Sequence, residues 1–448
     1  MSKYQAYAEY KDSGVNWLGN IPYDWSFRQL KYLCSYNDEV LPDSISNEYE
    51  IEYVDIGSVS SSEGIMETER LTYENAPSRA RRIVRDGDVI ISTVRTYLEA
   101  ISPINKPPEN LIVSTGFAVI RPGSNYYKSY AAYCLRANGF IKEVVAQSVG
   151  VSYPAINATD LVNIKVPEPS YVEQQKISNF LDHETAKIDT LIAKQQQLIA
   201  LLKEKRQAVI SHAVTKGLNP NAPMRDSGVE WLGEVPSHWT VAQLKFNTSE
   251  MQTGPFGSQL HAEDYITDGI PIINPAHIKD GKIVPDILVT VDEATQERLH
   301  RHKLSKGEII FARRGELGRC AIVNKDNEGW LCGTGSLKAR LNSNLLPEYA
   351  YLLIISDGVV SELSLESKGS TMENLNTETL GRVRMPVPPI CEQNEILNYV
   401  EDVSGKYGAL IDSSESAITL MQERRTALIS AAVTGKIDVR DWQDCRLG

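Results

Sequence analysis

Basic clusters flank two short apolar runs in this 448-residue chain, and the two arrangements match. The first run is Val89 to Val94, and the second is Gly307 to Ala312. The residues that flank the first run are Arg79, Arg81, Arg82, Arg85, Arg95, Thr96 and Tyr97. Those that flank the second are Arg298, Arg301, Lys303, Lys306, Arg313, Arg314 and Arg319. Arginine suits bidentate contacts with guanine edges and phosphates, so these loops are candidate nucleic-acid contacts, with solvated surface charge as the alternative.

Two further loops occupy matching late positions, Gly150 to Tyr153 and Lys368 to Thr371. Both combine glycine with a hydroxyl side chain, and the second adds a lysine. Backbone N–H groups and hydroxyls of such loops can donate hydrogen bonds to phosphate oxygens. We therefore predict phosphate contacts for Ser152, Lys368 and Ser370.

The overall charge is acidic, with a formal net charge of −12. Residues 26–169 carry 14 Lys/Arg against 18 Asp/Glu, and residues 240–389 carry 16 against 19. This balance argues against a uniformly basic, non-specific nucleic-acid binder. Any contact with nucleic acid must therefore use the local basic loops.

No motif in the sequence indicates catalysis. Lys368 to Thr371 has the wrong order for the phosphate-binding pattern GxxxxGK[ST]. Asn274 to His277 lacks the second proline and the aromatic residue of an adenine-methyltransferase motif. Gly333-Thr334-Gly335 is too short a glycine pattern for a nucleotide site, and the seven histidines show no HxxxH spacing. We predict a non-enzymatic chain that holds no metal or cofactor of its own.

The composition is that of an ordinary soluble globular protein, with 42% apolar and 23% charged residues, and we expect a cytoplasmic location. The first residues contain no apolar segment typical of a secretory signal, and the apolar runs are too short to span a membrane. Six cysteines without regular spacing indicate free thiols in a reducing compartment.

One segment occurs twice in the sequence. Residues 12–25 read DSGVNWLGNIPYDW and residues 226–239 read DSGVEWLGEVPSHW, with nine of fourteen positions identical. Residues 204–215 (EKRQAVISHAVT) also match residues 423–434 (ERRTALISAAVT). The two offsets are 214 and 219 positions, so one long unit is repeated. We expect each copy of the first segment, called here the tryptophan box, to mark the start of a unit and to pack against equivalent helix ends.

Between these copies the pattern is mixed α and β. Strand patterns occur at 51–56, 89–94, 116–120 and 307–312, and helical patterns at 126–138 and 140–147. Proline-rich exits at 167–169 and 386–389 each lead into a Glu-Gln pair that begins a helical stretch. The sequence predicts an α+β protein with two mixed α/β globular domains joined by two long helices.

The two helical stretches, 171–215 and 392–434, share one heptad register. The first seam is Ile177, Leu181, Glu184, Ile188, Leu191, Gln195, Leu198, Leu202, Lys205 and Val209. The second is Ile396, Val400, Val403, Tyr407, Leu410, Ser414, Ala417, Met421, Arg424 and Leu428. A shift of 219 positions superimposes the two seams. We predict that the helices pair around a pseudo-two-fold axis as an antiparallel coiled coil; the alternative is that each helix packs only on its own domain.

The duplicated boxes, the proline-rich exits into Glu-Gln and the two matched helices together resemble the specificity subunit of type I restriction-modification enzymes, over essentially the whole chain. The segment TGKIDVRDW at 434–442 supports the resemblance. Its regions are an N-terminal conserved segment (1–25), target recognition domain 1 (26–170), a central conserved helical region and linker (171–239), target recognition domain 2 (240–389) and a distal conserved helical region (390–448).

The resemblance implies that each target recognition domain reads one half of a split, asymmetric sequence in double-stranded DNA. The coiled coil would act as a ruler between the half-sites and would bind two modification (methyltransferase) subunits. We assign this partner contact to Leu191, Leu198, Leu202, Leu410, Met421 and Leu428. Restriction-translocation subunits would complete the complex.

S-adenosylmethionine, ATP and Mg would belong to those partner subunits. Two other functions remain open at this point. One is an orphan two-domain DNA-binding regulator, and the other is an interaction scaffold without affinity for DNA.

Overall fold

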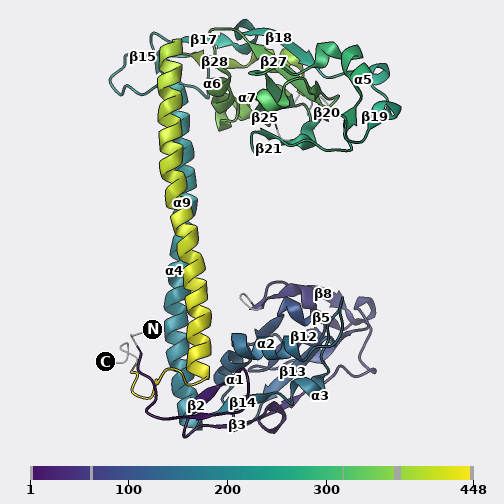
Figure 1. Cartoon of the computed structure of the whole chain (residues 1–448), viewed down its shortest axis with the longest axis vertical. Coiled ribbons are helices and arrows are strands. Elements are labelled where there is room, and N and C mark those ends of the chain that lie inside the picture. The colour runs from purple at the N-terminus through teal and green to yellow at the C-terminus, as the bar shows by residue number, and fades with distance from the viewer. Residues whose placement is uncertain (1–3, 61–63, 316, 368–374, 444–448) are drawn as a thin grey trace. The chain divides into compact units, whose positions relative to one another are not determined.

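The computed structural model describes residues 4–60, 64–315, 317–367 and 375–443 (Figure 1). The chain forms two compact units. Unit 1 comprises residues 1–196 and 415–448, and unit 2 comprises residues 197–414. Unit 1 is therefore assembled from two separate stretches of the chain, whereas unit 2 is one continuous stretch.

Unit 1 is built on two four-stranded sheets. The first has the order β11 (Ile101–Pro103), β10 (Val89–Ser92), β13 (Phe117–Pro122), β4 (Cys34–Tyr36). The second has the order β8 (Glu69–Thr72), β5 (Glu50–Val54), β12 (Leu111–Ser114), β9 (Ala80–Ile83). The β5–β12 pair is parallel and all other neighbours are antiparallel. All four residues of β10 are buried, as its Val-Ile-Ile run predicts.

Smaller elements complete unit 1. Its two-stranded pairs are β1 (Tyr10–Asp12) with β2 (Asn20–Pro22), β3 (Ser26–Gln29) with β14 (Lys165–Glu168), and β6 (Val59–Ser60) with β7 (Gly64–Ile65). Its short helices are α1 (Lys128–Leu135), α2 (Asn138–Ala146) and α3 (Ala158–Leu161). The main core lies between the first sheet, α1, α2 and the long helices.

Unit 2 repeats this arrangement. Its first sheet has the order β18 (Thr248–Thr253), β27 (Ser336–Leu341), β24 (Ile309–Ala312), β25 (Cys320–Ile322), the counterparts of β4, β13, β10 and β11. Its second sheet has the order β19 (Tyr265–Ile266), β23 (Thr290–Val291), β20 (Ile270–Ile273), β26 (Leu331–Cys332). The parallel pair β20–β26 matches β5–β12. The topology thus confirms the internal repeat.

The remaining elements of unit 2 follow the same plan. Its two-stranded pairs are β15 (Met224–Asp226) with β16 (Glu234–Pro236), β17 (Thr240–Gln243) with β28 (Arg384–Val387), and β21 (Ile278–Lys279) with β22 (Lys282–Ile283). Its short helices are α5 (Glu293–Arg298), α6 (Pro347–Ile354), α7 (Asp357–Ser367) and α8 (Thr377–Arg382).

The two long helices, α4 (Tyr171–Lys216) and α9 (Ile390–Val433), pack together in opposite directions. In unit 1 the beginning of α4 and the end of α9 share one core, and the Arg425 Nε lies 2.9 Å from the Asp189 Oδ1. In unit 2 the end of α4 and the beginning of α9 share another core. The antiparallel pairing is therefore confirmed. Each helix also packs on the globular domains. The alternative, in which each helix packs only on its own domain, is therefore wrong.

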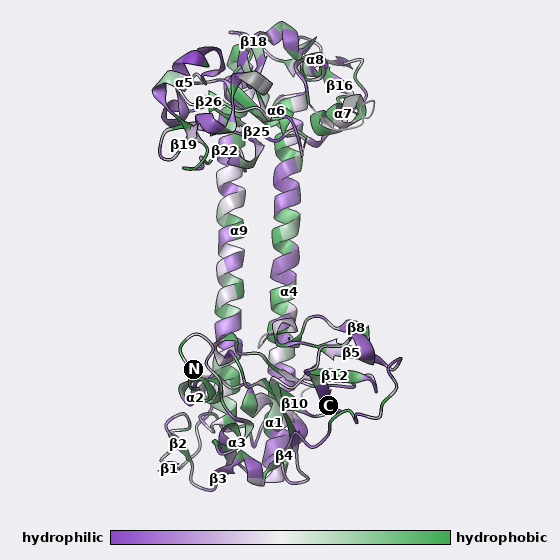
Figure 2. Ribbon diagram, turned by 90° about the vertical axis from the view of Figure 1, so that its right-hand side faces the viewer, coloured by the Kyte–Doolittle hydropathy of each residue, from purple (hydrophilic) through white to green (hydrophobic). Residues whose placement is uncertain are grey.

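The predicted seam is wrong at three of its leucines, and its polar members Lys205 and Arg424 are exposed as well. Leu191, Leu198 and Leu410 are 48%, 42% and 53% exposed, respectively. The less exposed positions lie one residue further on, where Ile411 is buried. A straight helix drifts by about 20° per heptad from a strict seven-residue repeat, so the seam moves onto the next residue. Figure 2 shows the resulting mixture of polar and apolar residues along both helices.

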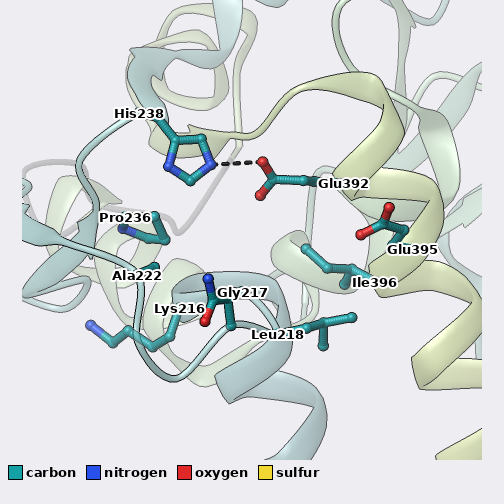
Figure 3. A pocket seen from close by; sticks show the side chains of 10 residues that line it. Lys216, Gly217, Leu218, Ala222, Pro236, His238, Glu392, Glu395 and Ile396 are labelled. Atoms are coloured by element: carbon teal, nitrogen blue, oxygen red, sulfur yellow. Dashed lines mark hydrogen bonds and ion pairs between the residues drawn. The ribbon is translucent and has the colours of Figure 1, made fainter.

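Both tryptophan boxes pack against equivalent helix ends, as predicted. Trp25 and Trp239 are each 1% exposed. The Trp25 Nε1 donates to Oε1 of Glu173 at the start of α4 (3.1 Å). The Trp239 Nε1 donates to Oε2 of Glu392 at the start of α9 (2.8 Å), and the same carboxylate lies 2.6 Å from the ring of His238 (Figure 3).

A left-handed glycine follows the last turn of each long helix, beside a tryptophan. Gly435 has φ 70° and Gly217 has φ 78°. A Cβ at Gly217 would lie 3.1 Å from the Trp239 ring, and one at Gly435 would lie 2.3 Å from the Pro22 Cδ. Glycine is required at both positions for two reasons: the backbone is left-handed, and the tryptophan box packs too close for a side chain.

The Glu-Gln pairs act as buried connectors between the helices and the globular domains. The Tyr127 amide donates to the Gln174 Oε1 (2.7 Å), and the Leu346 amide donates to the Gln393 Oε1 (2.8 Å). Each glutamine also donates to the carbonyl five residues before it. The same hydrogen-bonding set thus joins α1 to α4 and α6 to α9.

Among the described residues, neither the long helices nor any shorter one combines the length and apolar character needed to span a membrane. The five described cysteines are free thiols, four of them buried.

Candidate nucleic-acid interface

Two loops of unit 1 come together beyond the end of β10. The first, residues 93–99, contains the short helix Thr96–Leu98, and the second is residues 148–155. A bridge between Val94 and Ala155 joins the two loops, and a bridge between Val149 and Ala155 closes the second loop on itself. The structure therefore brings the predicted Arg95 and Tyr97 into the same surface as the predicted Ser152.

Arg95 lies over an aromatic ring on this surface. Its guanidinium carbon is 5.0 Å from the centroid of the Tyr153 ring, and Tyr153 itself is 64% exposed. Tyr97 is also exposed, and Val151 is fully exposed. An arginine held on an aromatic face keeps its five donors available while losing side-chain freedom before binding. Exposed aromatic and apolar groups beside it can contact bases.

Tyr153 and Val151 were not among the residues predicted from the sequence. Their loop was identified, but only Ser152 was assigned a contact. The sequence signal for a contact was the presence of two bulky side chains next to a glycine in a polar loop.

Thr96 has a different role from the one predicted. It is 3% exposed, and its Oγ1 donates to the Ser148 Oγ at 2.8 Å. A buried hydroxyl in this position joins the two loops to each other instead of reaching a ligand. Thr96 is therefore corrected from a DNA contact to a residue that holds the interface loops together.

The first loop contains left-handed residues at both of its turns. Arg95 has φ 50° and Glu99 has φ 52°. In the matching loop of unit 2 the left-handed residues are Gly315 and Gly318, with φ 85° and 82°. A non-glycine residue in this conformation costs about 1–3 kcal/mol, and such residues cluster at functional sites. Unit 1 carries an arginine where unit 2 carries a glycine.

The three predicted arginines near β9 lie in different environments. Arg79 is exposed, and its Nη2 is 3.0 Å from the Asp55 Oδ2. The Arg81 guanidinium lies 4.6 Å from the Tyr73 ring centroid. Arg82 has a buried Nε without a hydrogen-bonding partner, and burial lowers its pKa. The Thr115 amide donates to the Arg79 carbonyl (2.8 Å), and the next residue, Gly116, accepts from the Thr93 amide of the first loop (2.8 Å).

Arg313 of unit 2 occupies the backbone position of Thr93. The Arg313 amide donates to the Gly335 carbonyl at 2.9 Å, as the Thr93 amide does to the Gly116 carbonyl at 2.8 Å. The Arg313 guanidinium carbon lies 5.4 Å from the centroid of Phe256, a ring that is 53% exposed. Unit 2 thus also presents an arginine on an exposed aromatic ring, but it builds the pair from different positions.

Arg314 is exposed next to Arg313, as a direct contact requires. Lys368 and Ser370 lie outside the described residues. The segment that follows them begins at Leu375, whose amide donates to the Arg313 carbonyl at 2.8 Å. The same bond joins Ile156 to Thr93 in unit 1 (2.9 Å), so Leu375 and Ile156 occupy equivalent positions.

Two of the other predicted basic residues of unit 2 form ion pairs with carboxylates of the same unit. The Arg298 Nη2 lies 2.7 Å from the Asp264 Oδ1, and the Lys303 Nζ lies 2.7 Å from the Glu297 Oε2. Arg301 is exposed. Surface ion pairs of this kind contribute little, so their cations can be transferred to phosphates at small cost. Their contact with DNA stays a prediction.

Buried ion clusters support the sheet beneath each interface. In unit 2, Lys338 and Glu308 are 3% and 1% exposed and lie 3.4 Å apart (Nζ to Oε1). In unit 1, the Arg121 Nη2 lies 2.8 Å from the buried Asp88 carboxylate. The hydrogen bonds with Asp88 raise the pKa of Arg121. These charges are fully paired inside the domain, so they fix the strands rather than offering a ligand site.

Comparisons of this chain with protein-family models and with known proteins all point to the same family. A family model described as the type I restriction modification DNA specificity domain matches residues 22–200 and 250–412. The specificity subunit of the type I restriction enzyme EcoKI from Escherichia coli strain K12 is 23% identical over 333 residues, which are 72% of this chain and 68% of that one. The MjaIX specificity subunit of Methanocaldococcus jannaschii is 22% identical over 458 residues, 98% of this chain and 99% of its own.

Solved structures share the fold. A structure reported for complex assembly and conformational transition of the type I R-M system matches with a TM-score of 0.62 and 21% identity, over 93% of this chain and 99% of that chain. The crystal structure of the HsdS subunit from Thermoanaerobacter tengcongensis matches with a TM-score of 0.53 and 21% identity, over 93% of this chain and 98% of that chain. Since the family model covers most of both units, the chain belongs to the type I restriction-modification DNA specificity family.

Proposed function

We propose that this chain is the DNA-recognition subunit of a type I restriction-modification complex, in which each unit reads one half of a split DNA target. One observation carries the proposal: the same framework occurs twice, but its arginine–aromatic pairs differ, with an exposed arginine in unit 1 and a half-buried one in unit 2. Unit 1 presents Arg95 on Tyr153, and unit 2 presents Arg313 on Phe256. A repeated scaffold with different contact residues suits the recognition of two different half-sites.

The contacts would divide into two kinds. Exposed guanidinium groups would bind guanine edges or phosphates, and the aromatic and apolar groups beside them would contact thymine methyls or sugar. The remaining basic residues and the loop hydroxyls would fix each unit on the backbone. Because the chain as a whole is acidic, its electrostatic attraction for DNA is confined to these basic loops.

Two matched grooves offer sites for a pair of identical modification subunits. The groove on α9 has a volume of about 1170 Å³ and includes Arg424, Ala427, Leu428 and Ala431. The groove on α4 has a volume of about 400 Å³ and includes Lys205, Ala208, Val209 and His212. These two sets are 219 positions apart and lie in the duplicated helix sequence. One partner surface could therefore bind the chain twice.

The predicted partner residues divide between these roles. Leu428 lines the groove on α9 and also packs in the core of unit 1, beside the partly buried Met421. Leu191, Leu198 and Leu410 are exposed on the helices and are available to partner helices, while Leu202 is partly buried. Their contact with modification subunits is part of the proposal.

The chemistry of modification and cleavage is assigned to other subunits. Within the described residues, no group of three or more His, Cys, Asp or Glu side chains is placed to hold a metal ion. We propose that S-adenosylmethionine, ATP and Mg are bound by the modification and restriction-translocation subunits, and that this chain contributes recognition alone.

The test is to map methylated adenines across the genome of a host that expresses the chain with its modification subunits. A single bipartite motif with a fixed spacer is expected. Methylation without such a motif would contradict the proposal. Sequence-specific binding without any methylation would favour an orphan regulator, and absence of salt-dependent DNA binding with partners present would favour a scaffold.

Replacing Arg314 by alanine is expected to weaken recognition of one half-site only. The loss of an exposed guanidinium that contacts a base should cost about 1–3 kcal/mol at that half-site. Binding to duplexes with single substitutions in either half-site measures the effect. Lys325→Ala, at an exposed lysine of the same unit, is the control. Equal relaxation at both half-sites would exclude independent reading by the two units.

A glutamate placed in one groove is expected to remove one modification subunit. Ala427 and Ala208 are both exposed, so Ala427→Glu and Ala208→Glu should fold normally while placing a charge in the apolar contact. Mass measurement of the purified complex should show one modification subunit per chain for either single variant and none for the double variant. Ser416→Glu, at an exposed position on α9, is the control. Unchanged stoichiometry in the double variant would place the partner elsewhere.

A further inference from the structure

Two arginines meet in a crevice of unit 1 that lies outside the predicted contact loops. The crevice has a volume of about 660 Å³, and its charged lining residues are Glu99, Arg136, Lys142, Asp189 and Arg425. They come from the first loop, the α1–α2 junction, α2, α4 and α9, respectively. Five separate elements of unit 1 therefore contribute to a single polar site.

Arg136 has little of its charge compensated. Its Nε donates to the Ala132 carbonyl at 3.0 Å, and its guanidinium carbon lies 5.4 Å from the Tyr133 ring centroid. Within the described part of the chain, no carboxylate forms an ion pair with it. Burial lowers the pKa of Arg136 and the positive charge of Arg425 acts in the same direction, whereas Tyr133 and the more distant carboxylates of Asp182 and Asp189 raise it.

Arg425 is the second cation of the site. Its Nε is 2.9 Å from the Asp189 Oδ1, and this is an ion pair between α9 and α4. Arg136 and Arg425 also line an adjoining cavity of about 470 Å³ that includes Lys106. The two guanidinium groups thus stand between two cavities, with a lysine in each. An anion at this place would relieve the repulsion between them.

The crevice borders the candidate interface. Glu99 ends the loop that carries Arg95 and Tyr97, and this loop packs against α2. A DNA strand that contacts the first loop would therefore pass the opening of the crevice. Phosphate oxygens are the acceptors that paired guanidinium groups bind best.

We propose that Arg136, Lys142 and Arg425 bind a backbone phosphate of the DNA whose half-site is read by unit 1. The inference rests on the proposed function, and it adds a contact that anchors the strand beside the helices without reading sequence. This contact belongs to unit 1 alone. The position matching Arg136 in unit 2 is Ile355, and that matching Lys142 is Ser361, both 219 residues further on.

The test uses the full chain in complex with its modification subunits and a duplex that contains the mapped target. Arg425→Gln and Lys142→Gln should each reduce the slope of log K against log salt by about 0.9, the value for one lost phosphate contact. Each should weaken binding about tenfold at low salt, because a charge-assisted hydrogen bond is lost. Sequence preference at both half-sites should stay unchanged.

Two matched variants separate electrostatics from structure. Arg206→Gln changes the α4 residue that corresponds to Arg425, in the unit where the position matching Arg136 is Ile355, and should leave the slope unchanged. Asp189→Asn removes the carboxylate that competes for Arg425 and should strengthen binding, whereas a purely structural ion pair would make this variant weaker. Thermal unfolding confirms that each variant is folded.

An unchanged salt slope for Arg425→Gln, or an equal loss for Arg206→Gln, would overturn the inference while the proposed function stands. A wild-type complex that binds no duplex would overturn both. If inorganic phosphate stabilises the wild-type complex against heat while the DNA salt slope does not depend on Arg425, the crevice binds a free anion and the DNA contact is excluded.

Discussion

Removing one heptad from each long helix is expected to shorten the spacer between the two half-sites by about three base pairs. Seven helical residues span about 10 Å at 1.5 Å per residue, and successive DNA base pairs are about 3.4 Å apart. The deletion would remove residues 194–200 from α4 and 414–420 from α9, which keeps the stagger set by the Asp189–Arg425 ion pair. Selection from a library with randomised spacers measures the result.

Two controls accompany this deletion. Replacing the same fourteen residues by other heptads of equal length should leave the spacer unchanged. Deleting the heptad from α4 alone should break the shared register of the helices and destabilise their pairing. If the double deletion still selected the original spacer, the helices would not set the distance between half-sites.

Replacing Trp239 by alanine is expected to destabilise unit 2 by about 3–5 kcal/mol. The side chain is 1% exposed, packs beside Gly217 and donates to the Glu392 carboxylate at 2.8 Å. The variant leaves a cavity and removes the indole donor from the partly exposed Glu392 carboxylate. Trp25→Ala should have the same effect on unit 1, because its indole makes the corresponding bond to Glu173.

Hydrogen exchange measured peptide by peptide distinguishes the two variants. Each should lower the protection of its own unit, since each unit has its own main core. The exposed aromatic residues Tyr32 and Phe246, which are 214 positions apart like the tryptophans, supply matched alanine controls. Their replacement should change stability by less than about 0.5 kcal/mol. Equal loss of protection in both units from Trp239→Ala would show that the units unfold together.

Much of the framework could be predicted because it depends on local sequence. The lack of proline and glycine between Val172 and Lys216 predicts α4 almost to the residue, and the β-branched run at Val89 to Ile91 predicts the buried β10. The duplicated boxes predicted equivalent packing at two helix ends. Predicting these features requires only short-range sequence patterns and the observation that the sequence contains an internal repeat.

The contact surfaces could not be predicted because they depend on which distant segments meet. Arg95 lies on Tyr153 and Arg313 lies on Phe256, at sequence separations that no periodicity encodes. Thr96 is buried where it bonds to Ser148, which belongs to a loop about fifty residues further along the chain. The seam at Leu191 was wrong for a different reason, since the drift of a straight helix accumulates slowly and is invisible in a strict seven-residue pattern.

The assembly of unit 1 from two stretches of the chain has a consequence for the order of folding. Its core joins Trp25 and Ile177 to Ala432 and Val439, and the Asp438 amide donates to the Gln5 carbonyl at 2.8 Å. During synthesis, this core cannot close until the end of α9 has left the ribosome. Unit 2 is complete once residue 414 has emerged. The domain that is translated second is therefore the first that can finish folding, and the earlier one must wait for it.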